Sequence, residues 1–332
     1  MVESRLIQFE IDRGCLPVRL KSYVSVGLTL SLLACNAAGS GEPEIEAYPG
    51  YSGSYEGFTL VIDDQFDTFD ETLWKKGDGA VGQEAFCRFT ENGVRVEEGI
   101  LKLVVTPEYV PESYSEDHQL MKDDYDYSCG ELRTQPDIGF RYGRIEARMK
   151  APARETASGY ISSLFTYTLN KGRDSDNPEG LEWEEIDVEV EGGRPDKFQA
   201  NLIYGKDVWE WWRTREFGAW EDKIETGPVD AWRVFAIEWL PDQIRWYVDG
   251  ELVKTLTAED IDCDPDCIPP QVKPTPIPDG ETTVFMNFWI PNDIIQDDFG
   301  GNKERNQYPI TAEYDWFRYY QLDSHPVSFE LK

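Results

Sequence analysis

The sequence has only two histidines, His118 and His325, and few basic side chains for its length. So few histidines argue against Ser-His-Asp or Cys-His catalysis and against a multi-histidine metal centre. The 332 residues hold 32 Lys and Arg against 64 Asp and Glu, a net charge of −32. Nucleic acids and anionic membrane surfaces attract cationic proteins, so we expect no nucleic-acid partner. An enzyme of this composition is expected to use carboxylates for acid–base chemistry.

Long amphipathic helical patterns are also missing, and short runs rich in β-branched and aromatic residues follow from about Phe58. The strongest hairpin signal lies in Ile244–Leu256, where Asp249-Gly250 separates two such runs. The other predicted strands are Ile100–Thr106, Arg141–Met149, Tyr160–Tyr167, Glu185–Glu191, Phe198–Tyr204, Arg233–Trp239, Thr282–Trp289 and Ala312–Tyr320. Many short strands without helices between them predict an all-β fold, an antiparallel β-sandwich or jelly roll.

The beginning of the chain has the features of an export signal. Arg19 and Lys21 precede the apolar run Tyr23–Ala34, which has the length of a signal-peptide core and is short for a membrane span. The run ends at Cys35 in a stretch that resembles a bacterial lipobox, which predicts lipidation of Cys35, with ordinary signal cleavage nearby as the alternative. We therefore expect an exported protein, either lipid-anchored to the cell envelope or secreted, that touches membrane only through such an anchor.

Composition divides the chain into four parts. Residues 1–35 form the predicted signal, and residues 36–55, rich in Gly, Ser, Pro and Glu, a flexible tether. One β-sandwich domain is expected over 56–322, followed by a tail at 323–332, and we expect a monomer. The acidic segments at 107–128, 169–180 and 257–280 are predicted to be surface loops.

Four cysteines remain beyond the predicted signal, an even number that suits disulfides in an exported protein. Cys263 and Cys267 lie in the sequence CDPDC, where a bond would close a small loop. Cys87 and Cys129 then remain for the second pair. Zinc binding is the competing interpretation, but the spacing is not CxxC and no histidine lies nearby.

Acidic residues alternate strictly with apolar ones from Glu185 to Glu191 (EIDVEVE). On a strand this pattern places the carboxylates on one face and the apolar side chains on the other. Acid-x-acid-x-acid patterns are expected about twice by composition alone, and they also occur at Glu42–Glu46 and Asp262–Asp266. Only the pattern that begins at Glu185 lies on a β-branched, aromatic-flanked strand. We therefore favour catalysis over a solvated edge there.

The spacing of the row suits glycoside hydrolysis. Residues four apart on a strand have Cα atoms about 13 Å apart. Two glutamates leaning toward each other would approach the roughly 5–5.5 Å between carboxyls of a retaining enzyme. We predict that Glu185 and Glu189 are nucleophile and acid/base, with Asp187 between them to drive their pKa values apart. Spacing alone does not decide which glutamate attacks.

The segment Trp183–Glu189 (WEEIDVE) resembles the E-x-D-x-E signature of glycoside hydrolase family 16, and within it the bacterial lichenases, endo-β-1,3-1,4-glucanases. The resemblance extends from about Phe66 to Tyr320 and implies a concanavalin-like sandwich with a concave substrate groove. It implies Glu185 as nucleophile, Asp187 as assisting acid and Glu189 as acid/base, whereas Glu191 falls outside the pattern. Mixed-linkage β-glucan is the implied substrate, and catalysis requires no cofactor.

Further segments resemble the sugar-binding parts of the lichenases. The substrate-binding residues that they imply are Glu131, Arg133, Phe165, Tyr167, Trp183, Asn201, Asn287 and Trp289. The four aromatic residues have core packing as their alternative, and Glu131 with Arg133 has a surface ion pair. The resemblance also implies a structural calcium at Asp315 and the carbonyl of Gly99, with an ordinary exposed acid as the alternative for Asp315.

Departures from the family pattern concern substrate choice. Gly79–Glu84 replaces an Asn-rich loop, and Ile203 stands where lichenases carry a tyrosine. The roles of Trp209, Trp211 and Trp212 stay open between loop packing and sugar stacking. A β-1,3-glucan, a xyloglucan or an algal galactan is the alternative substrate. Outside catalysis, the alternatives are a carbohydrate-binding lipoprotein without turnover and a tethered surface protein.

Overall fold

The computed structural model describes residues 47–80, 85–111, 124–168, 183–205, 217–260, 277–293, 299–327 and 329. Their strands are β1 (Phe58–Asp64), β2 (Trp74–Lys76), β3 (Gly79–Ala80), β4 (Cys87–Phe89), β5 (Val94–Glu97), β6 (Ile100–Pro111), β7 (Asp124–Thr134), β8 (Gly143–Lys150), β9 (Ile161–Tyr167), β10 (Trp183–Glu191), β11 (Lys197–Gly205), β12 (Phe217–Glu225), β13 (Arg233–Trp239), β14 (Gln243–Val248), β15 (Glu251–Thr257), β16 (Thr283–Trp289) and β17 (Ile310–Leu322). Two short 3-10 turns, η1 (Glu91–Gly93) and η2 (Lys303–Arg305), complete the described elements. None of these elements is a helix long and apolar enough to cross a membrane.

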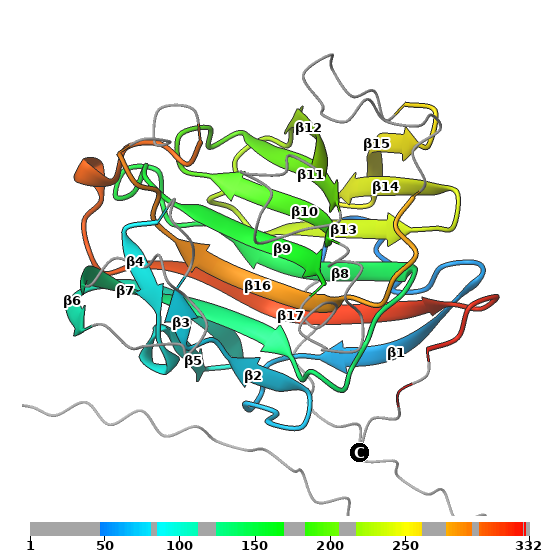
Figure 1. Ribbon diagram of the computed structural model, residues 1–332, viewed down its shortest axis with the longest axis horizontal. Helices are drawn as coiled ribbons and strands as arrows, with labels where there is room; N and C mark the ends of the chain where they lie inside the picture. The colour runs from blue at the N-terminus through cyan, green and yellow to red at the C-terminus, as the bar shows by residue number, and fades with distance from the viewer. Residues whose placement is uncertain are drawn as a thin grey trace, which may run out of the picture. The chain divides into compact units, whose positions relative to one another are not determined.

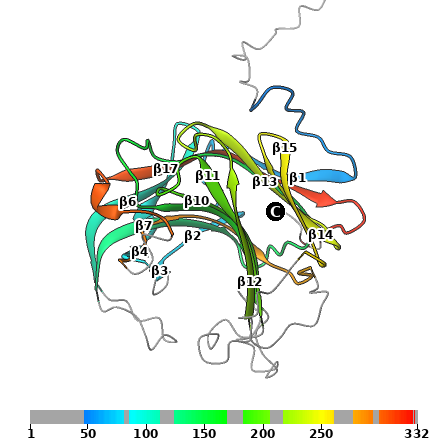
Figure 2. The same cartoon turned by 90° about the horizontal axis from the view of Figure 1, so that it is seen from above.

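The strands form two curved layers that face each other (Figures 1 and 2). The front sheet has the order β2-β7-β16-β9-β10-β11-β12. The back sheet has the order β5-β6-β17-β8-β13-β14-β15, with β1 along the second half of β17. Strand β6 pairs with β17 through its first half and with β7 through its second half, so it joins the two sheets. The predicted antiparallel β-sandwich is confirmed.

The core lies between the two sheets and is built by alternation along each strand. One row across the front sheet consists of residues in register on five strands, each fully buried: Leu132, Met286, Leu164, Val188 and Ala200. Burying an aliphatic side chain stabilises the fold by about 1.5–3 kcal/mol, so this row fixes the strand register. A slip by one residue would move the apolar row to the outer face. The register therefore also fixes which side chains point outward.

The Asp249-Gly250 hairpin is confirmed. It joins β14 to β15, with φ of 47° at Asp249 and 79° at Gly250. Positive φ at both central residues is typical of a type I′ turn, which glycine adopts without steric cost. Asp249 also accepts a hydrogen bond from the Val234 N–H through Oδ1, at 2.9 Å. The turn is thereby tied to the neighbouring strand β13.

The prediction of a loop throughout 107–128 is wrong at both ends of that segment. Strand β6 continues to Pro111 and β7 begins at Asp124, with Pro107 opposite Tyr127. Tyr125 is buried despite its acidic neighbours. Acidic composition hid the strands, because backbone pairing needs only alternate side chains to be buried. Residues 169–180 and most of 257–280 lie outside the described residues.

Part of the predicted tether belongs to the folded domain. Tyr51 and Tyr55 donate hydrogen bonds to the two carboxylate oxygens of Glu146, at 3.0 and 2.6 Å. Glu146 is fully buried and forms an ion pair with Arg144 at 2.8 Å. An unpaired buried carboxylate is costly, so these two tyrosines are needed on the outer face of the back sheet. The predicted boundary at residue 55 therefore lies too late in the chain, because the Gly- and Ser-rich composition obscured the aromatic residues that pack on the domain.

The predicted tail likewise packs on the domain through its aromatic side chains. The His325 ring contacts Tyr142 edge-on at 5.0 Å, and the Phe329 ring contacts Phe140 at 5.4 Å. Such pairs add about 0.5–1.5 kcal/mol beyond area burial.

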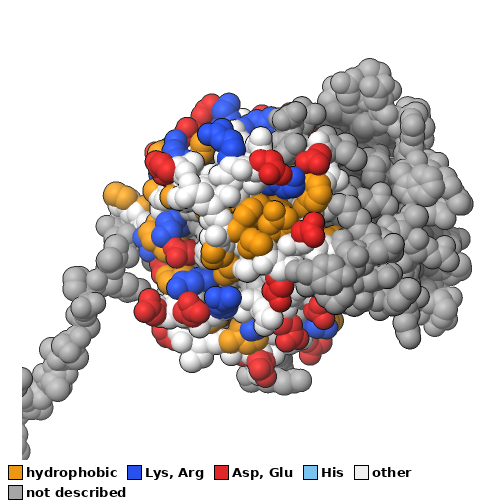
Figure 3. Space-filling model, turned by 90° about the vertical axis from the view of Figure 1, so that its left-hand side faces the viewer, with side chains coloured by type: hydrophobic (Ala, Val, Ile, Leu, Met, Phe, Trp, Pro, Cys, Tyr) orange, Lys and Arg blue, Asp and Glu red, His pale blue; other side chains and the backbone are white. Residues whose placement is uncertain are grey.

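On one end of the molecule, acidic and basic side chains surround a hydrophobic patch, so the charges mix there despite the strongly negative net charge of the chain (Figure 3).

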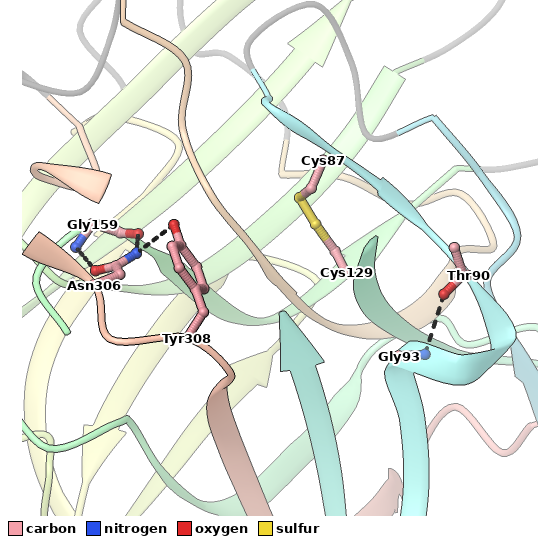
Figure 4. The surroundings of a disulfide bond; sticks show 7 residues. All are labelled: Cys87, Thr90, Gly93, Cys129, Gly159, Asn306 and Tyr308. Carbon is pink, nitrogen blue, oxygen red and sulfur yellow. Dashed lines mark hydrogen bonds between the residues drawn. A yellow bond between two sulfur atoms is a disulfide. The ribbon is translucent and has the colours of Figure 1, made fainter. Parts of the chain in front are cut away.

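Cys87 and Cys129 form a disulfide, as predicted, with Cα atoms 5.8 Å apart (Figure 4). It joins β4 to β7, which run parallel at this point. Thr90 accepts a hydrogen bond from the Gly93 N–H beside it, at 3.3 Å. Cys35, Cys263 and Cys267 lie outside the described residues.

Replacing Cys87 and Cys129 by serine is expected to lower the free energy of unfolding by about 4 kcal/mol, because the bond closes a 42-residue separation in the unfolded chain. Urea unfolding of the oxidised protein and of the double variant measures the difference. The wild-type protein unfolded with reductant is the control and should match the variant. An unchanged unfolding midpoint in the variant would contradict a stabilising bond.

Candidate active site

The three predicted carboxylates lie on the outer face of β10, in the middle of the front sheet. Strand register places Asp187 between Phe165 on β9 and Asn201 on β11. Ile186, Val188 and Val190 alternate with the carboxylates and are buried in the core. The Trp246 indole N–H, which comes from the back sheet, donates to the main-chain carbonyl of Asp187 at 2.9 Å. This hydrogen bond from the back sheet thus fixes the position of the β10 backbone beneath the carboxylates.

The same face collects the predicted sugar-binding residues of β7, β16 and β9 on one side of β10 and of β11 on the other. In one register row Glu131, Asn287, Ser163 and Glu189 follow one another across β7, β16, β9 and β10. The next row consists of Arg133, Phe285, Phe165, Asp187 and Asn201. Tyr167 lies opposite Glu185, and Trp289 shares a row with Glu191 through Ile161. The described side chains among those predictions are therefore brought together.

Burial and mutual repulsion control the protonation of the row. Asp187 is only 2% exposed, and burial raises its pKa well above the ordinary value, with further increases from Glu185 and Glu189. Burial, followed by the charge of Glu185, raises the pKa of Glu189 to about 8. The Asn201 side-chain amide donates to Glu189 Oε2 at 2.5 Å and opposes that increase. Glu189 therefore carries a proton at neutral pH, and burial favours the protonated form of Asp187.

Asn201 is itself oriented by a residue that the sequence analysis missed. The Gln199 amide donates to Asn201 Oδ1 at 3.0 Å, so the Asn201 amide N–H points to Glu189. Gln199 lies opposite Glu189 on β11. Phe285 was missed as well, and its ring stacks on Phe165 at 4.9 Å. Gln199 and Phe285 lie two positions before Asn201 and Asn287. Strand alternation places each of them on the same face as that asparagine, and this pattern would have identified both.

Glu131 and Arg133 lie at the far side of this face, in β7. Glu131 is 8% exposed and its carboxylate is 3.8 Å from the Arg133 guanidinium, so the two do not form a solvated surface pair. Burial raises the pKa of Glu131 to about 7 although Arg133 opposes the shift. A buried carboxyl whose pKa lies near 7 changes its protonation state at little cost, so it can either accept or donate a hydrogen bond.

Several buried polar atoms of this face have no hydrogen-bond partner among the described residues. They are Arg133 Nε, Asp187 Oδ1, Gln199 Oε1 and Asn287 Oδ1. Buried polar atoms are normally paired, and each unpaired one costs about 1–3 kcal/mol. Donors and acceptors left open on one surface suit a ligand rich in hydroxyl groups.

The aromatic predictions divide into two groups. Phe165 and Tyr167 are half-buried, and the Tyr167 ring meets Phe285 edge-on at 6.1 Å. Trp289 is 8% exposed and its ring lies 6.1 Å from Phe299. Backbone pairing joins Trp183 to Gly205, but the Trp183 side chain lies outside the described ones. Trp209, Trp211 and Trp212 also lie outside them.

The calcium assignment at Asp315 remains a prediction. The Asp315 carboxylate forms an ion pair with Arg148, a cation that competes with a metal ion for the same oxygens. Gly99 lies in the turn between β5 and β6, with φ of 73°. The described residues hold no cluster of three or more His, Cys, Asp or Glu side chains suited to a metal ion. No step of the chemistry depends on a metal ion at Asp315.

The family model of the glycosyl hydrolases family 16 matches residues 82–289. The chain belongs to family 16. Among curated relatives, a β-glucanase of Bacillus amyloliquefaciens is 32% identical over 258 residues, covering 76% of this chain and 84% of that protein. A β-glucanase of Bacillus subtilis (strain 168) is 29% identical over 305 residues, covering 91% and 97%.

Solved structures agree with this family 16 assignment. The Bacillus licheniformis β-glucanase is 25% identical with a TM-score of 0.55 over 79% of this chain and 97% of that one. A β-1,3-1,4-glucanase (lichenase) derived from a mouse hindgut metagenome is 27% identical with a TM-score of 0.55, covering 79% and 99%. The laminarinase catalytic domain from Thermotoga petrophila RKU-1, 20% identical with a TM-score of 0.59 over 80% and 98%, shares the fold. The protein is a glycoside hydrolase of the β-glucanase, lichenase-like kind.

Proposed function

We propose that this family 16 hydrolase is a retaining endo-β-glucanase that cleaves mixed-linkage β-1,3-1,4-glucan. The observation that carries the proposal is the carboxylate row of β10, in which Glu189 has a pKa of about 8 and shares one outer face with Glu185. A protonated carboxyl beside a potential nucleophile is what double displacement at a sugar requires.

Each group of the row has a role in the proposed reaction. The Glu185 carboxylate attacks the anomeric carbon, while Glu189 gives its proton to the departing glycosidic oxygen. The C–O bond to the leaving sugar breaks as an ester to Glu185 forms. In the second half, Glu189 takes a proton from water, whose oxygen attacks the anomeric carbon and releases Glu185. Asp187 lies between them, and its raised pKa favours a neutral form that limits the negative charge of the row.

The choice of substrate rests on the relatives and on the outer face. The curated relatives from Bacillus and the Bacillus licheniformis structure are named β-glucanases, and another solved structure is named a β-1,3-1,4-glucanase. Glu131, Asn201 and Asn287 offer polar groups for sugar hydroxyls beside the aromatic rings of β9 and β16. These groups support a glucan that lies across the strands. A β-1,3-glucan, a xyloglucan and an algal galactan are the competing outcomes.

Product analysis tests the substrate and the stereochemistry together. We expect barley mixed-linkage glucan to be cut into short oligosaccharides whose new reducing ends appear first as the β-anomer by proton NMR. Laminarin, xyloglucan and agarose serve as comparison substrates and should be cut at least about tenfold more slowly, the loss expected when about 1.4 kcal/mol of binding is missing. Initial release of the α-anomer would exclude retention, and preferential cleavage of a comparison polymer would exclude the mixed-linkage assignment.

A further inference from the structure

The outer face of β10 carries a fourth carboxylate that the proposed reaction does not use. Glu191 is 1% exposed and follows Glu189 by two positions, so the two side chains share the face. Its carboxylate forms ion pairs with Arg194, in the turn after β10, and with Lys223 on β12, the latter at 3.8 Å. A buried carboxylate is tolerated when side chains of opposite charge pair with it, as these two do.

Glu191 also holds the segment that closes this end of the front sheet. We call residues 299–309 the strap; it lies between β16 and β17 in the chain (Figure 1). The Gly300 N–H donates to Glu191 Oε2 at 3.1 Å, and the Gly300 carbonyl accepts from the Tyr160 and Gly193 N–H groups. Next to Gly300, the Phe299 ring meets Trp289. The Glu191 carboxylate thus positions the aromatic pair at the end of the proposed glucan site.

The strap has other anchors, so it does not depend on Glu191 alone. Asn306 accepts from the Ser158 and Gly159 N–H groups, both at 2.9 Å, and its own amide donates to the Gly159 carbonyl at 2.7 Å (Figure 4). The Gln307 N–H donates to the Thr156 carbonyl at 2.7 Å. A variant at Glu191 is therefore expected to fold.

The charges around Glu189 make its proton sensitive to Glu191. Among the described residues, the titratable or charged side chains on the same outer face include Glu185, Asp187 and Glu191 on β10, Tyr167 on β9, Lys197 on β11, Glu221, Lys223 and Glu225 on β12, Glu131 and Arg133 on β7, and Lys75 on β2, with Arg194 in the turn. Strands β9, β11 and β16 also contribute the uncharged Ser163, Gln199, Asn201 and Asn287 there. Asp187 precedes Glu189 by two positions in β10, and Glu191 is the acidic residue that follows it by two.

We propose that Glu191 is a positioning residue for the acid/base: it holds the strap against the end of β10 and keeps a negative charge beside Glu189, which favours its protonated form. This inference rests on the proposed role of Glu189. Removal of the Glu191 charge takes a negative charge away from Glu189 and leaves the positive charges of Arg194 and Lys223 in place, and both effects stabilise the ionised form of Glu189. Loss of Lys223 acts with the opposite sign.

The experiment compares pH profiles of kcat/KM on mixed-linkage glucan for the full chain. Glu191→Gln removes the charge and keeps an oxygen that accepts the Gly300 N–H, so we expect the alkaline limb to move down by about half a pH unit or more with KM little changed. Glu191→Leu removes the acceptor as well and is expected also to raise KM. Lys223→Gln, at a side chain 29% exposed, is expected to move the limb upward.

The matched control is Glu313→Gln, which removes a paired carboxylate from β17 on the back sheet and is expected to leave the limb in place. An alkaline limb that stays fixed in both Glu191→Gln and Lys223→Gln would overturn the inference, whatever the loss of overall rate. Failure of the proposed function gives a different result: Glu189→Gln would then leave the alkaline limb of the wild-type protein in place.

Discussion

Replacing Glu185 by glutamine is expected to lower kcat on mixed-linkage glucan by about 10⁴-fold or more. The amide cannot form the ester to the anomeric carbon, so the two-step route is lost and only positioning and protonation remain. Glu185 is half-buried and packs in register between Tyr167 and Ile203, and glutamine has the same shape. We therefore expect the variant to unfold at the wild-type temperature. Reducing-sugar release over long incubation measures the rate.

A glycine at the same position separates loss of the nucleophile from damage to the site. In Glu185→Gly, azide can enter the space of the missing carboxylate, attack the anomeric carbon from the same face and form an α-glycosyl azide. Glu189 still donates the proton to the leaving sugar. We expect azide to restore activity by at least about tenfold in Glu185→Gly and to leave Glu225→Gln, a control on the edge strand β12, unaffected. Reducing-end release by Glu185→Gln near the wild-type rate would remove Glu185 from the mechanism.

The carboxylate row was predictable because it depends only on local alternation. Once Ile186 and Val188 are required in the core, the strand period of two places Glu185, Asp187 and Glu189 on the opposite face. Their different protonation was less accessible from the sequence. Burial dominates the pKa increases at Asp187 and Glu189, and burial depends on how β9 and β11 flank the row.

Contacts between distant segments set the limit of sequence reasoning. Glu131 and Asn287 lie in one register row although 156 positions separate them, and only the resemblance to family 16 suggested that both touch sugar. Tyr51 and Tyr55 were assigned to a tether because nothing in their neighbourhood shows the buried Glu146 that they satisfy. The strap was missed for the same reason. Its hydrogen bonds to Glu191 and Gly159 join segments far apart in the chain, and the strap's own sequence shows no strand pattern or motif.

Replacing Glu189 by glutamine is expected to lower kcat/KM on glucan by about 10²- to 10⁴-fold, the range for loss of a general acid. The pKa of Glu189, raised to about 8 mainly by burial, means that the carboxyl is protonated below that pH and loses its proton above it. Wild-type activity therefore falls as the pH rises through about 8. In the variant this alkaline limb is expected to disappear, because glutamine does not titrate.

The leaving group distinguishes a lost acid from a distorted site. An aryl glycoside with an acidic phenol leaves without protonation, so Glu189→Gln is expected to form the glycosyl ester from it at a rate close to wild type, seen as a burst of phenolate. Hydrolysis of that ester then slows, because no base activates water, and azide is expected to accelerate this second step and yield the β-glycosyl azide. Equal losses on the glucan and the activated substrate would mean that Glu189 holds the site together and does not transfer the proton. The charge of Glu185 raises the pKa of both Asp187 and Glu189, so the limb lost with Glu189 is compared with that of Asp187→Asn. In that variant the two glutamates remain, and a limb should persist at a changed pH.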